Sequence, residues 1–461
     1  MEATVSDERP AQEGPATFRD VFSLAEFRVL FTASALSWIG DYVAKAAVTV
    51  LVYRQTDSVA LSAAAFAASY LPWLVGGPLL SALAERYRYR QVMVACDVVR
   101  MLLMVLVALP GVPPWAVLAL IFAATLANPP SQAARSALMP QILAGDRLVV
   151  GLSISVSSGQ AAQVLGYLLG AAVAAVSPAA ALLINAATFG LSAALVRFGL
   201  RDRPPAMTEA HRSHLLRETA EGFRLVFGRP VLRAIAVLVF SAMVFSIVPE
   251  GLAAAWAAER AGDGMDTGTA QAVIMAANPV GYVLGGLAVG RLVGPARRLA
   301  LMRPLAVIAP AVLVPALLDP PPVVVALLAA ACGFAVAGLI PVANGLFVQA
   351  LPEGYRARAF GVMASGTQII QGAAVLATGA LAERFSIPSV VGVWSAAGVL
   401  LMVLAVLTWP RPATVQAAVD SARAESAATA APDGRSGHTP GRGAAAGDRS
   451  GERGRRRHAV T

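Results

Sequence analysis

The sequence predicts an all-α membrane protein with twelve transmembrane helices in two groups of six. Hydrophobic residues make up 57% of the 461 residues and charged residues only 14%, compared with roughly 45–50% and roughly 25% in soluble domains. Apolar runs of about 20 residues, long enough to cross a hydrocarbon layer of about 30 Å, recur along the chain. Arginines collect in alternate gaps between these runs, which is a mark of membrane topology.

The expected membrane helices lie on either side of a polar segment. The first six are 28–53, 58–83, 90–110, 114–138, 148–176 and 178–200, and the last six are 231–257, 268–293, 299–318, 322–347, 358–382 and 387–409. The gaps after helices two, four, six, eight and ten contain most of the arginines. Because cytoplasmic loops carry an excess of positive charge, both termini are expected in the cytoplasm. An even number of crossings agrees with this orientation.

The chain is expected to contain two six-helix bundles and three polar segments. These are a cytoplasmic N-terminal tail (1–22), the first bundle (23–200), a cytoplasmic linker (201–229), the second bundle (230–410) and a cytoplasmic tail (411–461). An amphipathic helix along the membrane is expected in the linker, where one face can hold Leu215, Leu216, Phe223, Val226 and Phe227. The tail lacks apolar residues to bury, so we expect disorder there. Its RGRRRH sequence either contacts anionic lipid or has no role.

Composition and motifs exclude several classes of protein. The net charge of +9 does not indicate nucleic-acid binding, because the arginines lie between apolar runs and in the tail rather than on one folded face. No nucleophile elbow, nucleotide-binding loop or His/Cys cluster with metal-ligand spacing is present, so an enzyme is not expected, nor a metal site or a cofactor. Cys96 and Cys332 are far apart inside apolar runs and do not suggest a disulfide framework.

The two halves of the chain resemble each other. LMPQILAGDRLVVGLS (138–153), before the fifth helix, has a counterpart in FVQALPEGYRARAFGVMAS (347–365), before the eleventh. GGPLLSALAERYRYRQ (76–91), after the second helix, has a weaker counterpart in GGLAVGRLVGPARR (285–298), after the eighth. Parallel repeats of six helices with ligand sites between them are typical of secondary transporters.

At these residues the sequence resembles the major facilitator superfamily, in particular its bacterial exporter branch for drugs, macrolides and siderophores. The family's loop between helices two and three reads roughly G-x-L-A-D-R-x-G-R-R, and here it is SALAERYRYR. Leu83, Ala84, Arg86 and Arg90 match, and Glu85 replaces the aspartate. The resemblance implies that Glu85, Arg86 and Arg90 hold the cytoplasmic side closed during alternating access.

The fifth helix approaches the exporter pattern G-x-x-x-x-x-x-G-P-x-x-G. Gly159, Gly166 and Gly170 match, but Tyr167 stands in the place of the proline. The resemblance implies a role in exporter directionality, whereas close helix packing alone also accounts for the glycines. The arginine that many drug antiporters carry within helix four has no match, since Arg135 lies near the expected cytoplasmic end of that helix.

Helix one carries a polar stripe at helical spacing. It consists of Ser34, Ser37, Trp38, Asp41, Lys45 and Thr49, and Lys45 is the only lysine of the chain. The Gly-Asp at 40–41 resembles the S-x-x-G-D of the exporter branch. Charge at mid-membrane costs roughly 2.5–3.5 kcal/mol per residue, so the stripe is expected to face the bundle interior. Asp41 and Lys45, at i and i+4, are either a structural ion pair or a titrating element of a central cavity.

Glu250, just after Pro249 in helix seven, is the other buried carboxylate of the predicted helices. Helix seven is the repeat equivalent of helix one, so Glu250 is expected either to act on a proton or substrate in the cavity or to make a structural contact near the helix end. Further cavity candidates that the resemblance implies are Asn128, Gln132, Gln160, Gln163, Asn278, Asn344, Gln368 and Gln371, with Trp38, Trp73 and Trp256 as stacking surfaces. Each of the polar ones also serves as interhelical glue. Asp97 and Arg100, at i and i+3 in helix three, are expected to be structural.

Together these features predict a secondary transporter in the bacterial cytoplasmic membrane. It is expected to export a small amphipathic organic molecule, such as a drug, antibiotic or siderophore, by proton-coupled antiport, as a monomer in the lipid bilayer and without a cofactor. An uptake permease of the same fold is the nearest alternative. A membrane sensor or enzyme is a more distant one.

Overall fold

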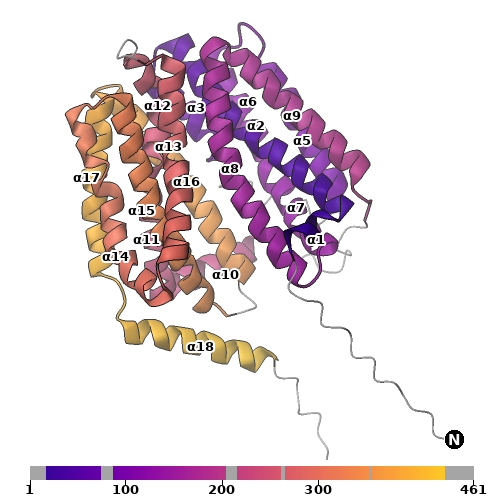
Figure 1. The fold of residues 1–461 in the computed structure, drawn as a ribbon, viewed down its shortest axis with the longest axis vertical. Helices are drawn as coiled ribbons and strands as arrows, with labels where there is room; N and C mark the ends of the chain where they lie inside the picture. The colour runs from indigo at the N-terminus through magenta and orange to yellow at the C-terminus, as the bar shows by residue number, and fades with distance from the viewer. Residues whose placement is uncertain (1–16, 74–86, 204–214, 261–264, 353–355, 431–461) are drawn as a thin grey trace, which may run out of the picture.

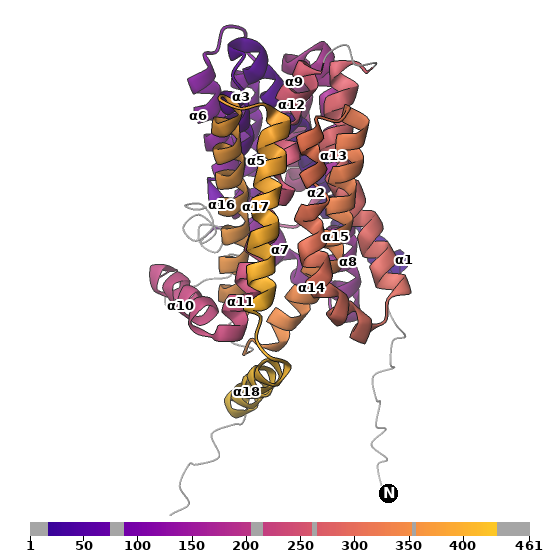
Figure 2. The same cartoon turned by 90° about the vertical axis from the view of Figure 1, so that its left-hand side faces the viewer.

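The computed structural model of this chain describes residues 17–73, 87–203, 215–260, 265–352 and 356–430. These residues form α-helices and one short 3₁₀-helix, and no strand occurs among them. The helices of the two halves of the chain form two bundles that lie side by side (Figure 1). We call the end of the molecule that carries the short helices α1, α10 and α18 the linker end, and the opposite end the far end (Figures 1 and 2).

The first bundle contains the helices between residues 18 and 199. They are α1 (Phe18–Phe22), α2 (Ala25–Thr56), α3 (Val59–Ala67), α5 (Tyr89–Val107), α6 (Pro114–Leu126), α7 (Asn128–Ile142), α8 (Asp146–Val176) and α9 (Pro178–Gly199). Helices α6 and α7 make one span that is interrupted at Ala127, just before Pro129 and Pro130. Proline lacks the amide hydrogen that continues a helix, which explains the break.

The second bundle contains α11 (Pro230–Ser246), α12 (Val248–Glu259), α13 (Thr267–Leu292), α14 (Pro295–Ala311), the 3₁₀-helix η2 (Val314–Leu318), α15 (Pro322–Gln349), α16 (Arg356–Ala382) and α17 (Ile387–Leu407). Helices α11 and α12 again form one span, interrupted at Ile247 two residues before Pro249. Ten helices of the described chain are long and apolar enough to cross a membrane. With α3, which ends at Ala67, and α5, which carries Asp97 and Arg100, the described helices account for the twelve predicted spans, although residues 74–86 of the second span are not described.

Two further helices lie at the linker end. Helix α10 (Leu215–Gly228) forms part of the linker that joins the two bundles in the sequence, and it packs on α16 and α11. Phe223 and Phe227 of this helix stay partly exposed, and their stacked rings have centroids 5.9 Å apart. Helix α18 (Pro412–Ala430) lies where we expected disorder, so that prediction was wrong for these residues. An alanine-rich sequence that begins with proline favours a helix, and Val419 and Ala422 provide a buried face for it.

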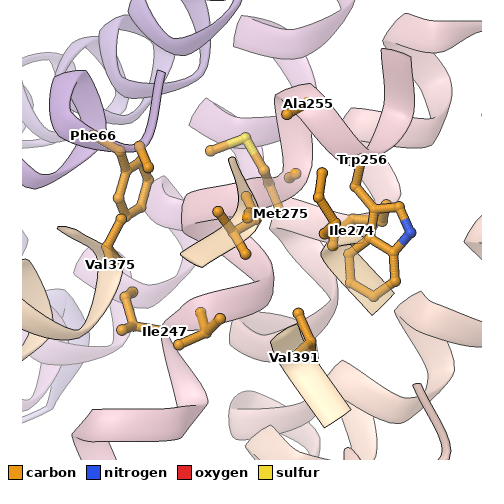
Figure 3. Packing of buried hydrophobic residues seen from close by; sticks show 14 of the residues in the cluster. Phe66, Ile247, Ala255, Trp256, Ile274, Met275, Val375 and Val391 are labelled. Carbon is orange, nitrogen blue, oxygen red and sulfur yellow. The ribbon is translucent and has the colours of Figure 1, made fainter. Parts of the chain in front are cut away.

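A hydrophobic core joins the two bundles toward the far end. Phe66 of α3 lies against Val375 of α16, and Met275 of α13 lies between them and Trp256 of α12 (Figure 3). Helix α8 packs on α13 and α3 packs on α16, so each contact pairs one helix from each bundle. At the linker end the described residues form no hydrogen bond between the two bundles.

The glycines of the fifth membrane helix bring it close to the first. A Cβ atom at Gly170 would lie 2.7 Å from the Cα of Val43, and one at Gly166 would lie 2.8 Å from the carbonyl oxygen of Ile39. Such short distances mean that only glycine fits at these two positions, as expected of small residues in membrane helix packing. Gly159 meets no neighbour within 4 Å. Packing therefore accounts for two of the three glycines in the exporter-like pattern.

Candidate functional site

Two adjoining cavities lie inside the molecule, the first within the first bundle with Gln368 of α16 at its edge, and the second between the two bundles. The first, which we call the Arg135 cavity, has a volume of about 200 Å³ and is lined mainly by α2, α5, α6, α7 and α9. The second, the Glu250 cavity, has a volume of about 300 Å³ and is lined by α2, α8, the α11–α12 span, α13, α15 and α16. Tyr42, Lys45 and Gln368 line both cavities. The polar stripe of the first membrane helix thus faces the bundle interior, as its composition requires.

Asp41 pairs with Arg100 of α5 rather than with Lys45. The Arg100 guanidinium makes an ion pair with the Asp41 carboxylate and lies 3.8 Å from Oδ1 of Asp97. It also donates to Oγ of Ser37, at 3.2 Å, and the Ser192 hydroxyl donates to Oδ2 of Asp97, at 2.6 Å. Of the two alternatives for Asp41 and Lys45, the structural ion pair is therefore wrong, because an arginine from a neighbouring helix reaches the carboxylate. All members of this cluster belong to the first bundle.

The Lys45 ammonium makes neither a hydrogen bond nor an ion pair with the described residues. Its Nζ atom lies 4.2 Å from the ring centroid of Tyr70 and 4.9 Å from that of Tyr42. A cation over an aromatic face gains roughly 0.5–2 kcal/mol, so the rings partly replace a counter-ion. Since Lys45 lines both cavities, the only lysine of the sequence lies at their boundary.

Glu250 forms a contact between the bundles. The Tyr167 hydroxyl of α8 donates to Oε2 of Glu250 in α12, at 2.9 Å, and both side chains are buried. A further buried bond also crosses between the bundles, because Nε2 of Gln271 donates to the carbonyl oxygen of Ala46 at 3.1 Å. Glu250 lines its cavity, which agrees with the first of the two roles expected for it. Sequence reasoning noted Tyr167 only as a missing proline and did not find it as the partner of Glu250.

Most of the predicted cavity residues lie where they were expected. Ser37, Trp38, Trp73, Asn128 and Gln132 line the Arg135 cavity, Gln160, Gln163, Asn278 and Gln371 line the Glu250 cavity, and Gln368 lines both. Asn278 and Gln371 also hold neighbouring helix α11, through the Ser246 carbonyl and the Met243 sulfur. Ser34 and Asn344 line neither cavity, and the Ser34 hydroxyl donates to the Leu30 carbonyl instead. Trp256 is fully buried in the far-end core and offers no stacking surface.

Arg135 is the main residue that sequence reasoning set aside. It is only 7% exposed and lines the cavity named after it, with its guanidinium 5.4 Å from the Trp38 ring centroid. The sequence places Arg135 near the end of the fourth helix, but the break at Ala127 begins a new helix, α7, that positions Arg135 beside the cavity. The two proline residues of this segment were the signal that could have found it.

The predicted cytoplasmic gating loop lies largely outside the described residues. Glu85 and Arg86 belong to the segment 74–86, which the structure does not describe. Arg90 is described, and it lies 3.2 Å from the Asp202 carboxylate and donates to the Leu200 carbonyl at 3.2 Å. It therefore ties the start of α5 to the end of α9, within one bundle.

Glu383 makes a third polar contact between the bundles, at the far end. Its Oε1 accepts a hydrogen bond from the Ser58 hydroxyl, at 2.5 Å, and one from the backbone N–H of Ala60, at 2.8 Å. Both donors belong to the start of α3, where amide groups have no partner within the helix. The bond from Ser58 and that from Ala60 hold the pKa of the Glu383 carboxyl below its usual 4.5.

Comparison with protein families identifies the chain. The model of the Major Facilitator Superfamily matches residues 30–329 and 266–446, which is most of the sequence. The chain belongs to the major facilitator superfamily. Accordingly it is a membrane transporter rather than an enzyme. No curated protein matches this superfamily member closely enough to be counted as a relative.

Solved structures of the superfamily share the fold. The nucleoside transporter NupG matches with a TM-score of 0.63 and 15% identity, over 83% of this chain and 99% of that chain. A POT family transporter in complex with a thioalcohol-conjugated peptide matches with a TM-score of 0.65 and 12% identity, over 82% and 94%. A bacterial homologue of the human lysosomal transporter Spinster, described as inward-facing and unoccupied, matches with 0.59 and 14%, over 86% and 97%. At these identities the likeness shows the fold alone.

Proposed function

We propose that this superfamily member is a secondary transporter that exports a small amphipathic organic molecule across the bacterial cytoplasmic membrane in exchange for protons. The linker end faces the cytoplasm, in keeping with the arginine-rich gaps on that side. The described contacts between the bundles lie toward the far end, so this conformation is closed to the outside. One chain in the bilayer transports its substrate by alternating access. The proton gradient supplies the energy, and no cofactor is needed.

The observation that carries this proposal is the Glu250–Tyr167 contact inside a cavity. Opening the far end separates α8 from α12, which breaks this buried hydrogen bond. Once the far end is open, Glu250 can exchange a proton with the outside, whereas in the closed state it is buried against Tyr167. This difference in access between the two states is what exchange of a substrate for a proton requires.

The direction of transport is tested in cells that lack the protein. A deletion strain and the complemented strain are loaded with a panel of antibiotics and siderophores, and the accumulated amount of each is measured with and without a protonophore. An exporter gives higher accumulation in the deletion strain, and the protonophore removes the difference. Lower accumulation in the deletion strain would identify an uptake permease instead. A difference that survives the protonophore would exclude the proton gradient as the energy source.

A further inference from the structure

The Arg135 cavity contains three buried donors without an acceptor. Among the residues that the structure describes, Nε of Arg135, Oγ of Ser131 and Nδ2 of Asn185 have no hydrogen-bond partner, and all three residues line this cavity. Their exposed fractions are 7%, 3% and 1%. About 90% or more of buried polar groups in proteins have a partner. All three atoms are themselves covered, so they show that the cavity wall is short of acceptors, and the part of Arg135 left to contact a ligand is the rest of its guanidinium.

The Arg135 charge is also unpaired, in contrast to its neighbour. Arg100 has the carboxylates of Asp41 and Asp97 beside it. Arg135 makes no ion pair or hydrogen bond with any residue that the structure describes, so the Asp97 and Asp41 carboxylates act on it only through space, and the Trp38 ring lies beside it. A buried charge without a partner is strongly unfavourable. An anionic ligand at Arg135 would remove this cost.

The geometry points to a carboxylate as the ligand group. The planar guanidinium presents a fork of donors that matches a carboxylate with two parallel hydrogen bonds. Trp38 and Trp73 add flat apolar surface to the same lining, which suits a ring attached to the acid. Lys45 provides a second positive charge where the Arg135 cavity adjoins the Glu250 cavity.

We propose that Arg135 binds the carboxylate of the substrate, so that the exported molecule is an amphipathic organic acid. The statement that the acid is exported rests on the proposed function. Binding of the acid to Arg135 does not, and it can be measured on the purified protein. Arg135 thereby becomes a specificity-determining residue rather than part of the proton pathway.

Binding of 2-naphthoate and of its methyl ester is the direct test. Both probes have the same ring, and only the acid offers a charged fork to Arg135. Isothermal titration of the purified full chain in detergent is expected to show at least about tenfold tighter binding of the acid, since hydrogen bonds between charged groups are the strong ones. Arg135→Gln should abolish this preference and Arg135→Lys should keep part of it. Arg303→Gln, an exposed arginine of α14, is the matched control and should leave it unchanged.

A fold defect can be separated from a binding defect. Arg135→Gln removes an unpaired buried charge, so its thermal unfolding temperature without ligand is expected to equal or exceed that of the wild type. 2-Naphthoate should raise the unfolding temperature of the wild type but not that of the variant. Equal binding of acid and ester by the wild type, absent binding of the acid, or equal loss of both probes in Arg135→Gln would each overturn the inference.

The proposed function can fail independently. Acid-selective binding that depends on Arg135, together with lower accumulation of 2-naphthoate in the deletion strain, would keep this binding site and reverse the direction of transport. Export of antibiotics without acid-selective binding would support the proposed export function and overturn the proposal of a carboxylate site at Arg135.

Discussion

Asp41 and Glu250, the two carboxylates that line the cavities, differ in whether their partner lies in the same bundle or in the opposite one. Asp41 is paired by Arg100, and both belong to the first bundle. Glu250 is paired by Tyr167, and these two residues belong to opposite bundles. When the bundles move as rigid bodies, the first contact stays intact and the second must break. A carboxylate can report the state of the transporter only through a contact that changes, so the comparison predicts coupling at Glu250 and structural support at Asp41.

Glu250→Gln is expected to have the largest effect on transport. The amide keeps a hydrogen bond to Tyr167 but cannot take up a proton, so proton-driven export should fall at least about tenfold while exchange of substrate without a gradient continues. Export and exchange are measured in proteoliposomes with and without an imposed pH gradient. Glu259→Gln, at the exposed end of the same helix α12, should retain full activity. Unimpaired proton-driven export in Glu250→Gln would remove Glu250 from the coupling mechanism.

The fold could be predicted because its signals are local in the sequence. Each apolar run predicts its own helix, and the arginines between the runs predict the topology without knowledge of any contact. The alanine-rich helix α18 was missed because low hydrophobicity was read as disorder, although Val419 and Ala422 suffice to bury one face.

The pairing of the cavity charges could not be predicted in the same way. Spacing along one helix shows only partners on that helix, so Lys45 was the visible partner of Asp41, while Arg100 reaches it from α5. Tyr167 likewise meets Glu250 across the bundle interface. The family resemblance predicted most of the residues that line the cavities. It could not predict that Arg135 lacks a hydrogen-bond partner, because this depends on how helices far apart in the sequence pack together.

Asp41→Asn is expected to lower the stability of the protein without changing proton coupling. Loss of one carboxylate from a buried cluster is expected to cost roughly 3 kcal/mol of unfolding free energy, reduced because Asp97 remains beside Arg100 and Asp41 is partly exposed. Thermal unfolding in detergent should show the loss, and Asp420→Asn on the exposed helix α18 should show almost none. The pH dependence of export should stay as in the wild type. A fully stable variant whose export no longer depends on pH would make Asp41 the proton carrier instead.

Glu383 gives the smallest expected effect and separates far-end closure from proton coupling. Because its pKa is held below 4.5 by Ser58 and Ala60, its contribution to the closed state is fully present above that value and is lost as pH falls through the lowered pKa. Closure between pH 8 and pH 5.5 is therefore expected to be independent of Glu383, which leaves any pH dependence in this range to Glu250. Glu383→Gln should shift the equilibrium toward opening by at most about fivefold, since exposed charged contacts contribute about 0.2–1 kcal/mol. Distances between spin labels on the far-end tips of α3 and α16 measure this shift, with the adjacent exposed Arg384→Gln as control. A shift in the opening of wild-type protein between pH 8 and pH 5.5 that Glu383→Gln abolishes would show that this contact, rather than Glu250, senses the proton.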